Sequence, residues 1–228
     1  MDRTPSGING LDSLVEGGFP KGRNIFLSGS AGSGKTILSS QFLYNGAYKY
    51  HEKGLYVSFE EPITDIIEDV SRFGWDIQKM IDQDKLKFIY FPILKQDFDE
   101  NVFDLLSTLV KEVKDNKYDR LVIDSLPAFG MAYSDFNKMR QELFLFLHEL
   151  RKLGCTTFVI TEKPSGAIGL TRFGIEDFLA QGLIILHLGH TYRGIEVRKI
   201  RGTSHSTNVH RMRIGDEGIV VYPGDHPY

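Results

Sequence analysis

The stretch Gly29-Ser30-Ala31-Gly32-Ser33-Gly34-Lys35-Thr36 decides the fold of this chain. It fits the pattern G-x-x-x-x-G-K-[ST], whose glycines let the backbone turn tightly and bring its N–H groups against phosphate oxygens. The apolar run 24–28 before it predicts a buried strand, and residues 37–50 after it predict a helix. Strand, loop and helix in this order are the context that a phosphate-binding loop needs. A glycine-rich turn with a chance lysine is the alternative, and the two flanks disfavour it.

Each polar group of this loop has an expected role. Lys35 reaches the β- and γ-phosphates of the nucleotide, and the hydroxyl of Thr36 ligates Mg²⁺. The N-terminus of the following helix adds partial positive charge at the same place. The residues of the loop expected to bind ATP are Ser30, Ala31, Gly32, Ser33, Gly34, Lys35 and Thr36.

Composition and charge narrow the class of protein. The chain has 228 residues, enough for a sizeable core, and its net charge is −3 with no basic tail or block. We therefore expect no constitutive nucleic-acid binding. The one cysteine, Cys155, excludes an internal disulfide and a multi-cysteine zinc site, and it suits a reducing cytoplasm. Because no signal peptide and no apolar stretch of about 20 residues is present, we expect a cytoplasmic protein without a membrane span.

The order of the expected elements predicts an α/β fold. Strands are expected at 24–28, 54–58, 86–91, 120–124 and 156–161, and helices at 37–50, 63–73, 77–82, 102–116 and 136–153. Strands that alternate with helices form βαβ units, so we expect a mostly parallel central sheet flanked by helices. The last strands are expected at 182–188, 191–200, 209–214 and 218–222. Their short turns predict antiparallel hairpins that extend the sheet, and residues 1–228 are expected to form one domain.

Three acidic residues follow predicted strands, at the edge where open α/β sheets bind their ligands. Asp124 ends the run 121–123 and fits the carboxylate that holds Mg²⁺ beside the phosphate loop. Glu60 and Glu61 end the second strand, where a carboxylate can deprotonate the water that attacks the γ-phosphate. Because neighbouring residues on an extended chain point opposite ways, Glu60 is favoured as the base, with Glu61 in support. The expected metal residues are Thr36, Asp124 and Glu60; a turn cap and solvated charges are the alternatives.

The stretch Val197-Arg198-Lys199-Ile200-Arg201-Gly202-Thr203-Ser204-His205 combines cations with a turn. On a strand, Lys199 and Arg201 share one face. In a lone domain these cations would merely be solvated. Beside a neighbour's nucleotide they would neutralise the charge that builds on the γ-phosphate, as arginine fingers do. The chemistry of the residues leaves both interpretations open.

The remaining candidates are histidines and aromatic residues. Histidines late in the chain are His187, His190, His205 and His210. Their spacing is not typical of a metal site and no cysteines join them, so we expect no metal other than Mg²⁺. Phe144 and Phe146 are expected in the core, and His148 in the core or against a partner. Phe73 can either stack on adenine or lie in the core.

These stretches together resemble the KaiC family of RecA-like ATPases. The likeness runs nearly end to end and is greatest to one ATPase half of the circadian clock protein, as in single-domain KaiC-like proteins. The segments that carry it are 6–12, 59–62, 71–76, 121–125, 161–163, 172–178 and 199–205. The last of these is the most specific, because ordinary phosphate-loop proteins lack it. The resemblance implies a RecA-like P-loop NTPase fold.

The resemblance also implies a homo-oligomeric ring, usually a hexamer, with ATP held between subunits. One side of each site would supply the phosphate loop and Glu60, with Arg72 and Phe73 near adenine. The other side would reach the neighbour's ATP with Lys199, Ile200, Arg201, Thr203 and His205, and with Gly215 and Asp216 near the base or ribose. This implication favours the trans-acting interpretation of the cations in the 199–205 stretch.

Two departures limit what the resemblance implies. The clock protein carries two such domains, whereas one is expected here, so its partner-coupled timing cycle is not implied. Its second half also phosphorylates an adjacent Ser-Thr pair. The corresponding residues here, Phe173-Gly174-Ile175-Glu176-Asp177-Phe178, contain no such pair, so autokinase activity is not expected.

Three functions are compatible with the sequence. The leading hypothesis is a Mg²⁺-dependent ATPase that assembles as a ring and turns over slowly, as regulatory proteins do. The second is a nucleotide-gated interaction module, in which ATP builds the ring and an unidentified protein partner binds it. The third, a recombinase-like DNA-binding ATPase, ranks last because no added DNA-binding segment and no basic stretch stands out.

Overall fold

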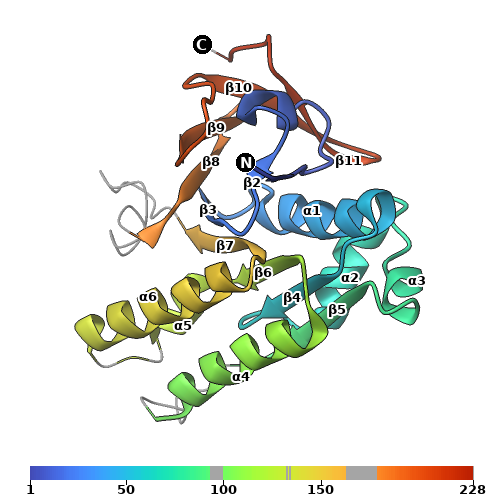
Figure 1. Cartoon of the computed structure of the whole chain (residues 1–228). Coiled ribbons are helices and arrows are strands. Elements are labelled where there is room, and N and C mark those ends of the chain that lie inside the picture. The colour runs from blue at the N-terminus through green and yellow to red at the C-terminus, as the bar shows by residue number, and fades with distance from the viewer. Residues whose placement is uncertain (93–99, 132, 134, 163–178, 228) are drawn as a thin grey trace.

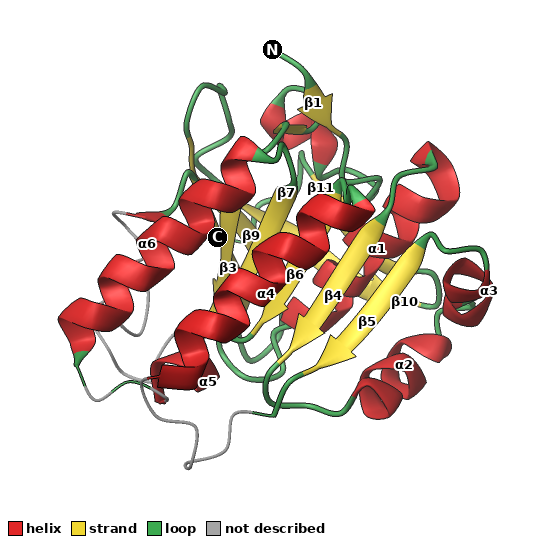
Figure 2. Cartoon of the chain, turned by 60° about the horizontal axis from the view of Figure 1, so that its bottom comes forward, coloured by secondary structure: helices red, strands yellow, loops and turns green. Residues whose placement is uncertain are grey.

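A mixed sheet lies between two layers of helices in the computed structural model (Figures 1 and 2). The structure describes residues 1–92, 100–131, 133, 135–162 and 179–227. Within these residues the sheet has nine strands in the order β11-β10-β9-β8-β3-β7-β6-β4-β5. Its strands are β3 (Asn24–Gly29), β4 (Gly54–Ser58), β5 (Leu86–Tyr90), β6 (Arg120–Asp124), β7 (Thr156–Glu162), β8 (Gly182–Leu188), β9 (Arg193–Ile200), β10 (Val209–Gly215) and β11 (Gly218–Tyr222).

The expected alternation of strands and helices is confirmed. The helices are α1 (Lys35–Tyr50), α2 (Ile63–Ser71), α3 (Ile77–Asp82), α4 (Glu100–Asn116), α5 (Leu126–Met131) and α6 (Phe136–Lys152). Strands β3 to β8 run parallel, and β9, β10 and β11 continue the sheet antiparallel. One detail differs from the expectation: β8 was grouped with the antiparallel hairpins, but it pairs in parallel with β3 and is antiparallel only to β9.

The two faces of the sheet bury separate cores. Side chains of α1, α2 and α3 pack on one face, and those of α4, α5 and α6 on the other. Strand β3 divides its side chains between them: Ile25 and Leu27 face α1, whereas Phe26 faces α6. Each of these side chains is fully buried, and each contributes roughly 1.5–3 kcal/mol of hydrophobic stabilisation. Because both faces of β3 are covered, its central residues 25–27 are all apolar, and their packing fixes the loop that follows the strand.

The predicted helix ends follow local chemistry. The carboxylate of Asp76 accepts a hydrogen bond from the backbone N–H of Lys79 and caps α3. Asp135 caps α6 in the same way through the N–H of Asn137. Gly154, with φ of +74°, follows the last turn of α6, where only glycine adopts that angle without strain. The helices expected at 77–82 and 136–153 therefore begin at these caps, and their bounds agree with the structure to within one residue.

One expectation about the helical layer is wrong. Phe144 is 54% exposed and stacks on His148, whereas Phe146 is buried as expected. Helix α5, between β6 and α6, is an element for which the sequence analysis makes no prediction. Pro127 is tolerated there because it lies in the first turn, where its missing N–H has no intrahelical partner.

The N-terminal segment packs against the start of the sheet. It contains a small antiparallel pair, β1 (Arg3–Thr4) and β2 (Phe19–Pro20), and a 3₁₀ turn, η1 (Asp12–Val15). Figure 1 shows this segment beside β8 to β11, with α1 beneath it. The hydroxyls of Thr4 and Thr156, which begins β7, lie 2.9 Å apart and join this segment to the sheet.

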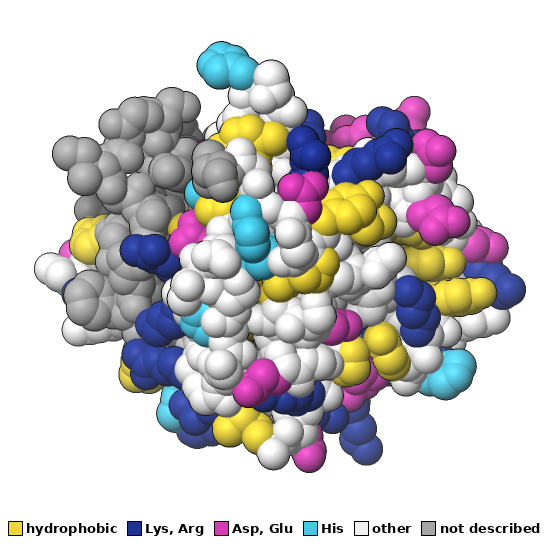
Figure 3. Space-filling model, turned by 90° about the horizontal axis from the view of Figure 1, so that it is seen from above, with side chains coloured by type: hydrophobic (Ala, Val, Ile, Leu, Met, Phe, Trp, Pro, Cys, Tyr) yellow, Lys and Arg dark blue, Asp and Glu magenta, His cyan; other side chains and the backbone are white. Residues whose placement is uncertain are grey.

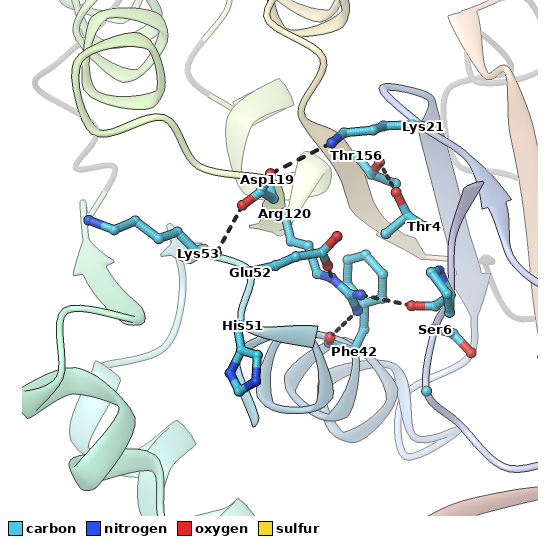
Figure 4. A network of polar contacts seen from close by, with 12 residues as sticks. Thr4, Ser6, Lys21, Phe42, His51, Glu52, Lys53, Asp119, Arg120 and Thr156 are labelled. Atoms are coloured by element: carbon cyan, nitrogen blue, oxygen red, sulfur yellow. Dashed lines mark hydrogen bonds and ion pairs between the residues drawn. The ribbon is translucent and has the colours of Figure 1, made fainter. Parts of the chain in front are cut away.

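A buried arginine joins this segment to the sheet (Figure 4). The Nε of Arg120 lies 2.5 Å from Oε2 of Glu52. Its other nitrogens donate to the carbonyls of Phe42, at 2.7 Å, and Pro5, at 2.8 Å. The guanidinium also lies over the Phe42 ring, and a Cβ on Gly46 would overlap it. The network therefore fixes α1, β6 and the N-terminal segment to one another.

Candidate nucleotide-binding site

The phosphate loop is a tight turn between β3 and α1. Gly32 and Gly34 have φ of +72° and +104°, angles that favour glycine. The N–H of Ser33 donates to the carbonyl of Ser30, which closes the turn. The hydroxyl of Ser33 is buried without a hydrogen-bond partner in the described part of the chain. A loop with an unpaired polar atom and free N–H groups at a helix N-terminus fits a phosphate group.

Lys35 is held over this loop by backbone carbonyls. Its Nζ donates to the carbonyls of Gly29 and Ser30, each at 2.9 Å. Burial lowers the pKa of Lys35, and the nearby carboxylates of Glu162, Asp124 and Glu60 raise it in opposition. The ammonium therefore faces the acidic end of the site, where it can neutralise phosphate charge.

Asp124 and Tyr56 share a hydrogen bond below the loop. The two residues are on neighbouring strands, β6 and β4, and the Tyr56 hydroxyl donates to Oδ2 of Asp124 at 2.5 Å. Tyr56 is fully buried and its hydroxyl also meets the side chain of Thr36. Burial raises the pKa of Asp124 to about 6; the Tyr56 hydrogen bond and Lys35 oppose this rise.

The two glutamates after β4 point in different directions. The carboxylate of Glu60 accepts a hydrogen bond from the hydroxyl of Ser125 at 2.9 Å, so it faces the residue that follows Asp124. Burial raises the pKa of Glu61, and so do the carboxylates of Asp69 and Asp65 on α2. Glu60 thus lies beside Ser125, whereas Glu61 lies within electrostatic range of the carboxylates of α2 and of Asp124.

The donor atoms of this end of the sheet suit Mg²⁺. Thr36, Asp124 and Glu60 offer hydroxyl and carboxylate oxygens, the hard ligands that Mg²⁺ prefers, and a Mg²⁺ site needs one or two carboxylates beside the phosphates. The described residues contain no group of three or more His, Cys, Asp or Glu side chains placed to hold another metal ion. His187 instead pairs with Glu196 at 2.9 Å.

The cations of the 199–205 stretch lie at the opposite edge of the sheet. Ile200 pairs with Gly182, and Gly182 pairs with Ile25 near the start of β3. From Ile25 to Gly29 the strand rises by roughly 13 Å, so Arg201 lies at least that far from the phosphate loop along the strand direction. The structure therefore does not bring Lys199 or Arg201 to the chain's own loop.

Arg201 belongs to a cationic region at that edge. Burial lowers the pKa of Arg23 there, and the positive charges of Arg151 and Arg201 lower it further. Arg201 is exposed, and its backbone N–H donates to the carbonyl of Gln181. Ile200 lies in the core at 4% exposure, so only its backbone can reach a neighbour.

Gly215 and Asp216 lie on the other side from these cations. They form the turn between β10 and β11, and a Cβ on Gly34 would meet Ile214 at 3.2 Å. The turn is therefore beside the chain's own phosphate loop. The expectation that groups Gly215 and Asp216 with the neighbour-facing residues is revised for this reason.

The expected adenine residues lie near the same turn. Phe73 is 4% exposed and packs against Trp75 at 4.9 Å between ring centroids. Of the two positions that the sequence left open for Phe73, adenine stacking or the core, the structure shows the core. Arg72 is exposed, with its guanidinium 5.3 Å from the Phe73 ring. A Cβ on Gly218 would overlap Trp75, which places the end of the β10–β11 turn against this cluster.

Several residues of the site have no role assigned from the sequence. Tyr56 occupies one position of an apolar strand, and no motif indicates that its hydroxyl has a function. Ser125 follows β6 and Glu162 ends β7; both lie in segments that carry the family resemblance, but no role was assigned to them. Arg193 donates to the carbonyl of Gly32 at 2.6 Å, a contact that only the strand order reveals. The expected motif residues Lys163 and 172–178 lie outside the described residues.

The fold and this site define an ATP-binding ATPase domain of the RecA-like type. The family model described as "ATPase: KaiC" matches residues 4–226. This chain belongs to the KaiC family. It is 37% identical over 226 residues to the circadian clock oscillator protein KaiC of Synechococcus elongatus, covering 95% of this chain and 43% of that protein. It is 33% identical over 231 residues to KaiC of Prochlorococcus marinus, covering 97% of this chain and 45% of that protein.

A solved structure agrees with the family membership. The crystal structure of a KaiC-like protein from the archaeon Pyrococcus horikoshii has a TM-score of 0.87 and 38% identity, covering 97% of this chain and 99% of that one. The present chain spans less than half the length of the curated relatives named above. None of the helices in the described part of the chain has the length and apolar character needed to span a bilayer.

Proposed function

We propose that this protein is a Mg²⁺-dependent ATPase that assembles as a homo-oligomeric ring, with each ATP between two subunits. The observation that carries this proposal is the separation of the two halves of the site. Lys35, Asp124 and Glu60 lie at the carboxyl edge of the parallel strands, whereas Lys199 and Arg201 lie at the amino edge. A head-to-tail arrangement joins the second half of one subunit to the first half of the next.

The chain's own residues have distinct tasks in this proposal. The N–H groups of the loop and Lys35 bind the phosphates, and Glu60 orients a water molecule and takes its proton. Mg²⁺, held through Thr36 and Asp124, supplies Lewis-acid polarisation of the phosphate oxygens when it is bound. Glu61 supports the charge balance around Glu60.

The neighbouring subunit contributes positive charge. Its Lys199 and Arg201 neutralise the charge that develops on the γ-phosphate, and its Thr203 and His205 contact the nucleotide. Arginine fingers of this kind contribute on the order of 10³-fold or more to turnover in other systems. Gly215 and Asp216 contact the base or ribose from the same subunit as the phosphate loop, together with Arg72.

A hexameric ring, a regulatory role and slow turnover are further parts of this proposal. The relatives described above are named circadian clock oscillator proteins, which supports the regulatory role. A regulatory protein needs changes of state rather than flux. Autokinase activity is not part of the proposal.

ATP turnover per subunit, measured over a wide range of protein concentration, tests the proposal. We expect specific activity to rise steeply as subunits associate. Mixing inactive Arg201→Ala and Glu60→Gln proteins should restore activity, because one intact half comes from each. Constant activity in a protein that stays monomeric would overturn the shared site.

A nucleotide-gated interaction module is the second candidate. It is favoured by the exposed apolar side chains on α6, where Phe136, Phe144 and Leu145 are 46%, 54% and 53% exposed. Such a face fits a protein partner. If ATP-driven assembly persists in Glu60→Gln, and the wild type releases no phosphate within the lifetime of its assembled ring, this candidate replaces the first.

A further inference from the structure

The turn between β9 and β10, residues 201–208, is fixed in position by hydrogen bonds from Arg3. The Nη1 of Arg3 donates to the hydroxyl of Thr203 at 3.2 Å. The same nitrogen donates to the carbonyls of Val15, at 3.0 Å, and Gly18, at 2.8 Å, and Nη2 pairs with Glu16. The planar guanidinium is therefore fixed by several acceptors before it reaches Thr203, which gives that contact a defined direction.

A second set of contacts holds the far end of the turn. The hydroxyl of Ser206 lies 2.5 Å from Nε2 of His210, and either group can donate. The N–H of Ser206 donates to the carbonyl of Leu14 in η1 at 3.2 Å. His210 is 2% exposed and packs against the ring of His226, and burial lowers its pKa.

Little apolar packing supports the turn besides these contacts. A hollow of about 500 Å³ lies between it and the N-terminal segment, lined by polar side chains except for Leu14 and Pro223. Figure 3 looks onto this end of the molecule and shows histidine side chains within that face. A turn beside such a hollow depends on directed hydrogen bonds for its position, because no close-packed core restrains it.

We propose that Arg3 and His210 are positioning residues for the reaction at the neighbouring subunit's site. They hold Thr203 and Ser206, and through them the turn that carries Arg201 and His205. Arg3 contacts Thr203 at the amino edge of the sheet, away from the chain's own phosphate loop, and His210 is level with Gly29 but three strands away from it. This inference rests on the proposed function.

Arg3→Ala should lower the turnover number more than ATP affinity. The phosphate loop that binds ATP is untouched, whereas the finger residues lose their fixed position. A displacement of about 1 Å in a catalytic group costs on the order of 10²-fold, so we expect a 10- to 100-fold fall in kcat with little change in KM. Lys87→Ala is the control, because Lys87 on β5 forms a surface pair with Glu112, and β5 lies at the far end of the strand order from β9.

The contact between Arg3 and Thr203 can be isolated by a double-mutant cycle. Thr203→Val removes the hydroxyl that Arg3 meets, and Thr203→Ser keeps it. We expect Arg3→Ala to have little further effect on kcat in the Thr203→Val background and its full effect in Thr203→Ser. Equal effects in both backgrounds would show that Arg3 does not act through Thr203. If Arg3→Ala fails to fold, Ser206→Ala tests the same inference from the His210 side.

Assemblies mixed from two variants test whether Arg3→Ala impairs only the turn or the whole subunit. Arg3→Ala subunits keep an intact phosphate-loop side, and Glu60→Gln subunits keep an intact turn. If subunits mix at random, roughly a quarter of the interfaces combine the two good halves, so activity should return. Lys35→Ala with Glu60→Gln is the negative control, since both changes affect the same side.

The outcomes separate this inference from the proposed function. Gain of activity in both the Arg3→Ala and the Arg201→Ala mixtures supports the positioning role. Gain with Arg201→Ala but not with Arg3→Ala overturns that role and leaves the shared site standing. Wild-type kcat in Arg3→Ala alone also overturns it. No gain in either mixture means that the proposed shared site itself is wrong.

Discussion

The hydroxyl of Tyr56 donates a hydrogen bond of 2.5 Å to Oδ2 of Asp124, from the neighbouring strand and from beneath the phosphate loop. The same hydroxyl meets the side chain of Thr36. One buried tyrosine thus touches two of the three residues whose oxygens suit Mg²⁺. Groups that orient the ligands of a metal commonly matter as much as the ligands themselves.

Tyr56→Phe should weaken Mg²⁺-dependent ATP binding. The change removes one hydroxyl from a fully buried position, so Asp124 loses the donor that fixes its carboxylate. We expect the concentration of Mg²⁺ needed for half-maximal ATP binding to rise by about 10- to 100-fold. A Mg²⁺ titration at constant ATP, read by equilibrium binding, measures this.

Tyr118→Phe is the matched control for that titration. Tyr118 is also buried and also bonds a carboxylate, Glu112, but it follows α4 far along the chain from the phosphate loop. Its removal should leave the Mg²⁺ requirement unchanged. An equal rise in both variants would mean that the effect of Tyr56 is a general loss of stability.

The pKa of Asp124 predicts how stability depends on pH. It is about 6 in the folded protein without nucleotide, against about 3.9 for an unfolded aspartate. Between these values the folded state binds more protons, so the free energy of unfolding falls as pH rises from about 4 to about 6 and is level above that range. The fall from this group is roughly 3 kcal/mol.

Asp124→Asn tests this dependence. The variant cannot ionise at that position, so the thermal midpoint of the protein without nucleotide should be higher than that of the wild type at pH 7.5. The difference should shrink toward pH 4, and stabilisation by Mg²⁺ and ATP should be lost. Asp225→Asn, at a surface pair with Arg211, is the control. A midpoint for Asp124→Asn below that of the wild type at pH 7.5 would contradict the sign.

Much of the fold is local enough to predict. The bounds of β4, β6, β8 and β11 match the expected ones, because glycines or charges frame each apolar run. The error at Phe144 has a periodic cause. The buried positions of α6 recur at helical spacing, and Phe144 falls between them although its neighbours in sequence are equally apolar.

The candidate site likewise contains parts that the sequence predicts and parts that it does not. The phosphate loop is contiguous in sequence, so its residues and context identify it directly. Gly215 and Asp216 lie near the phosphate loop because β10 ends at the same edge of the sheet as β3. That arrangement follows from the pairing of β8 with β3 and β9. No local pattern contains that pairing. Contacts such as Arg193 to Gly32 are invisible for the same reason.

The Arg120 network predicts a stability effect far from the nucleotide. Glu52→Gln leaves the guanidinium of Arg120 buried with no opposite charge, although its carbonyl partners remain. Removing one member of a buried pair typically costs 3–5 kcal/mol; because Glu52 keeps 20% exposure, we expect roughly 2–3 kcal/mol. Urea unfolding measures it. Glu149→Gln, which changes an exposed pair with Lys152, should have little effect.

The glutamate pair gives the sharpest catalytic prediction. Glu60→Gln should lower turnover at saturating ATP by on the order of 10²–10³-fold, because an amide cannot take a proton from water. ATP affinity should change little, since the loop is intact. Glu61→Gln should have a smaller effect, because its carboxyl faces Asp65 and Asp69 of α2. Single-turnover phosphate release measures both variants. Hydrolysis at the native rate in Glu60→Gln, with turnover lost in Glu61→Gln, would exchange the two roles and imply that the hydrogen bond from Ser125 holds a supporting carboxylate.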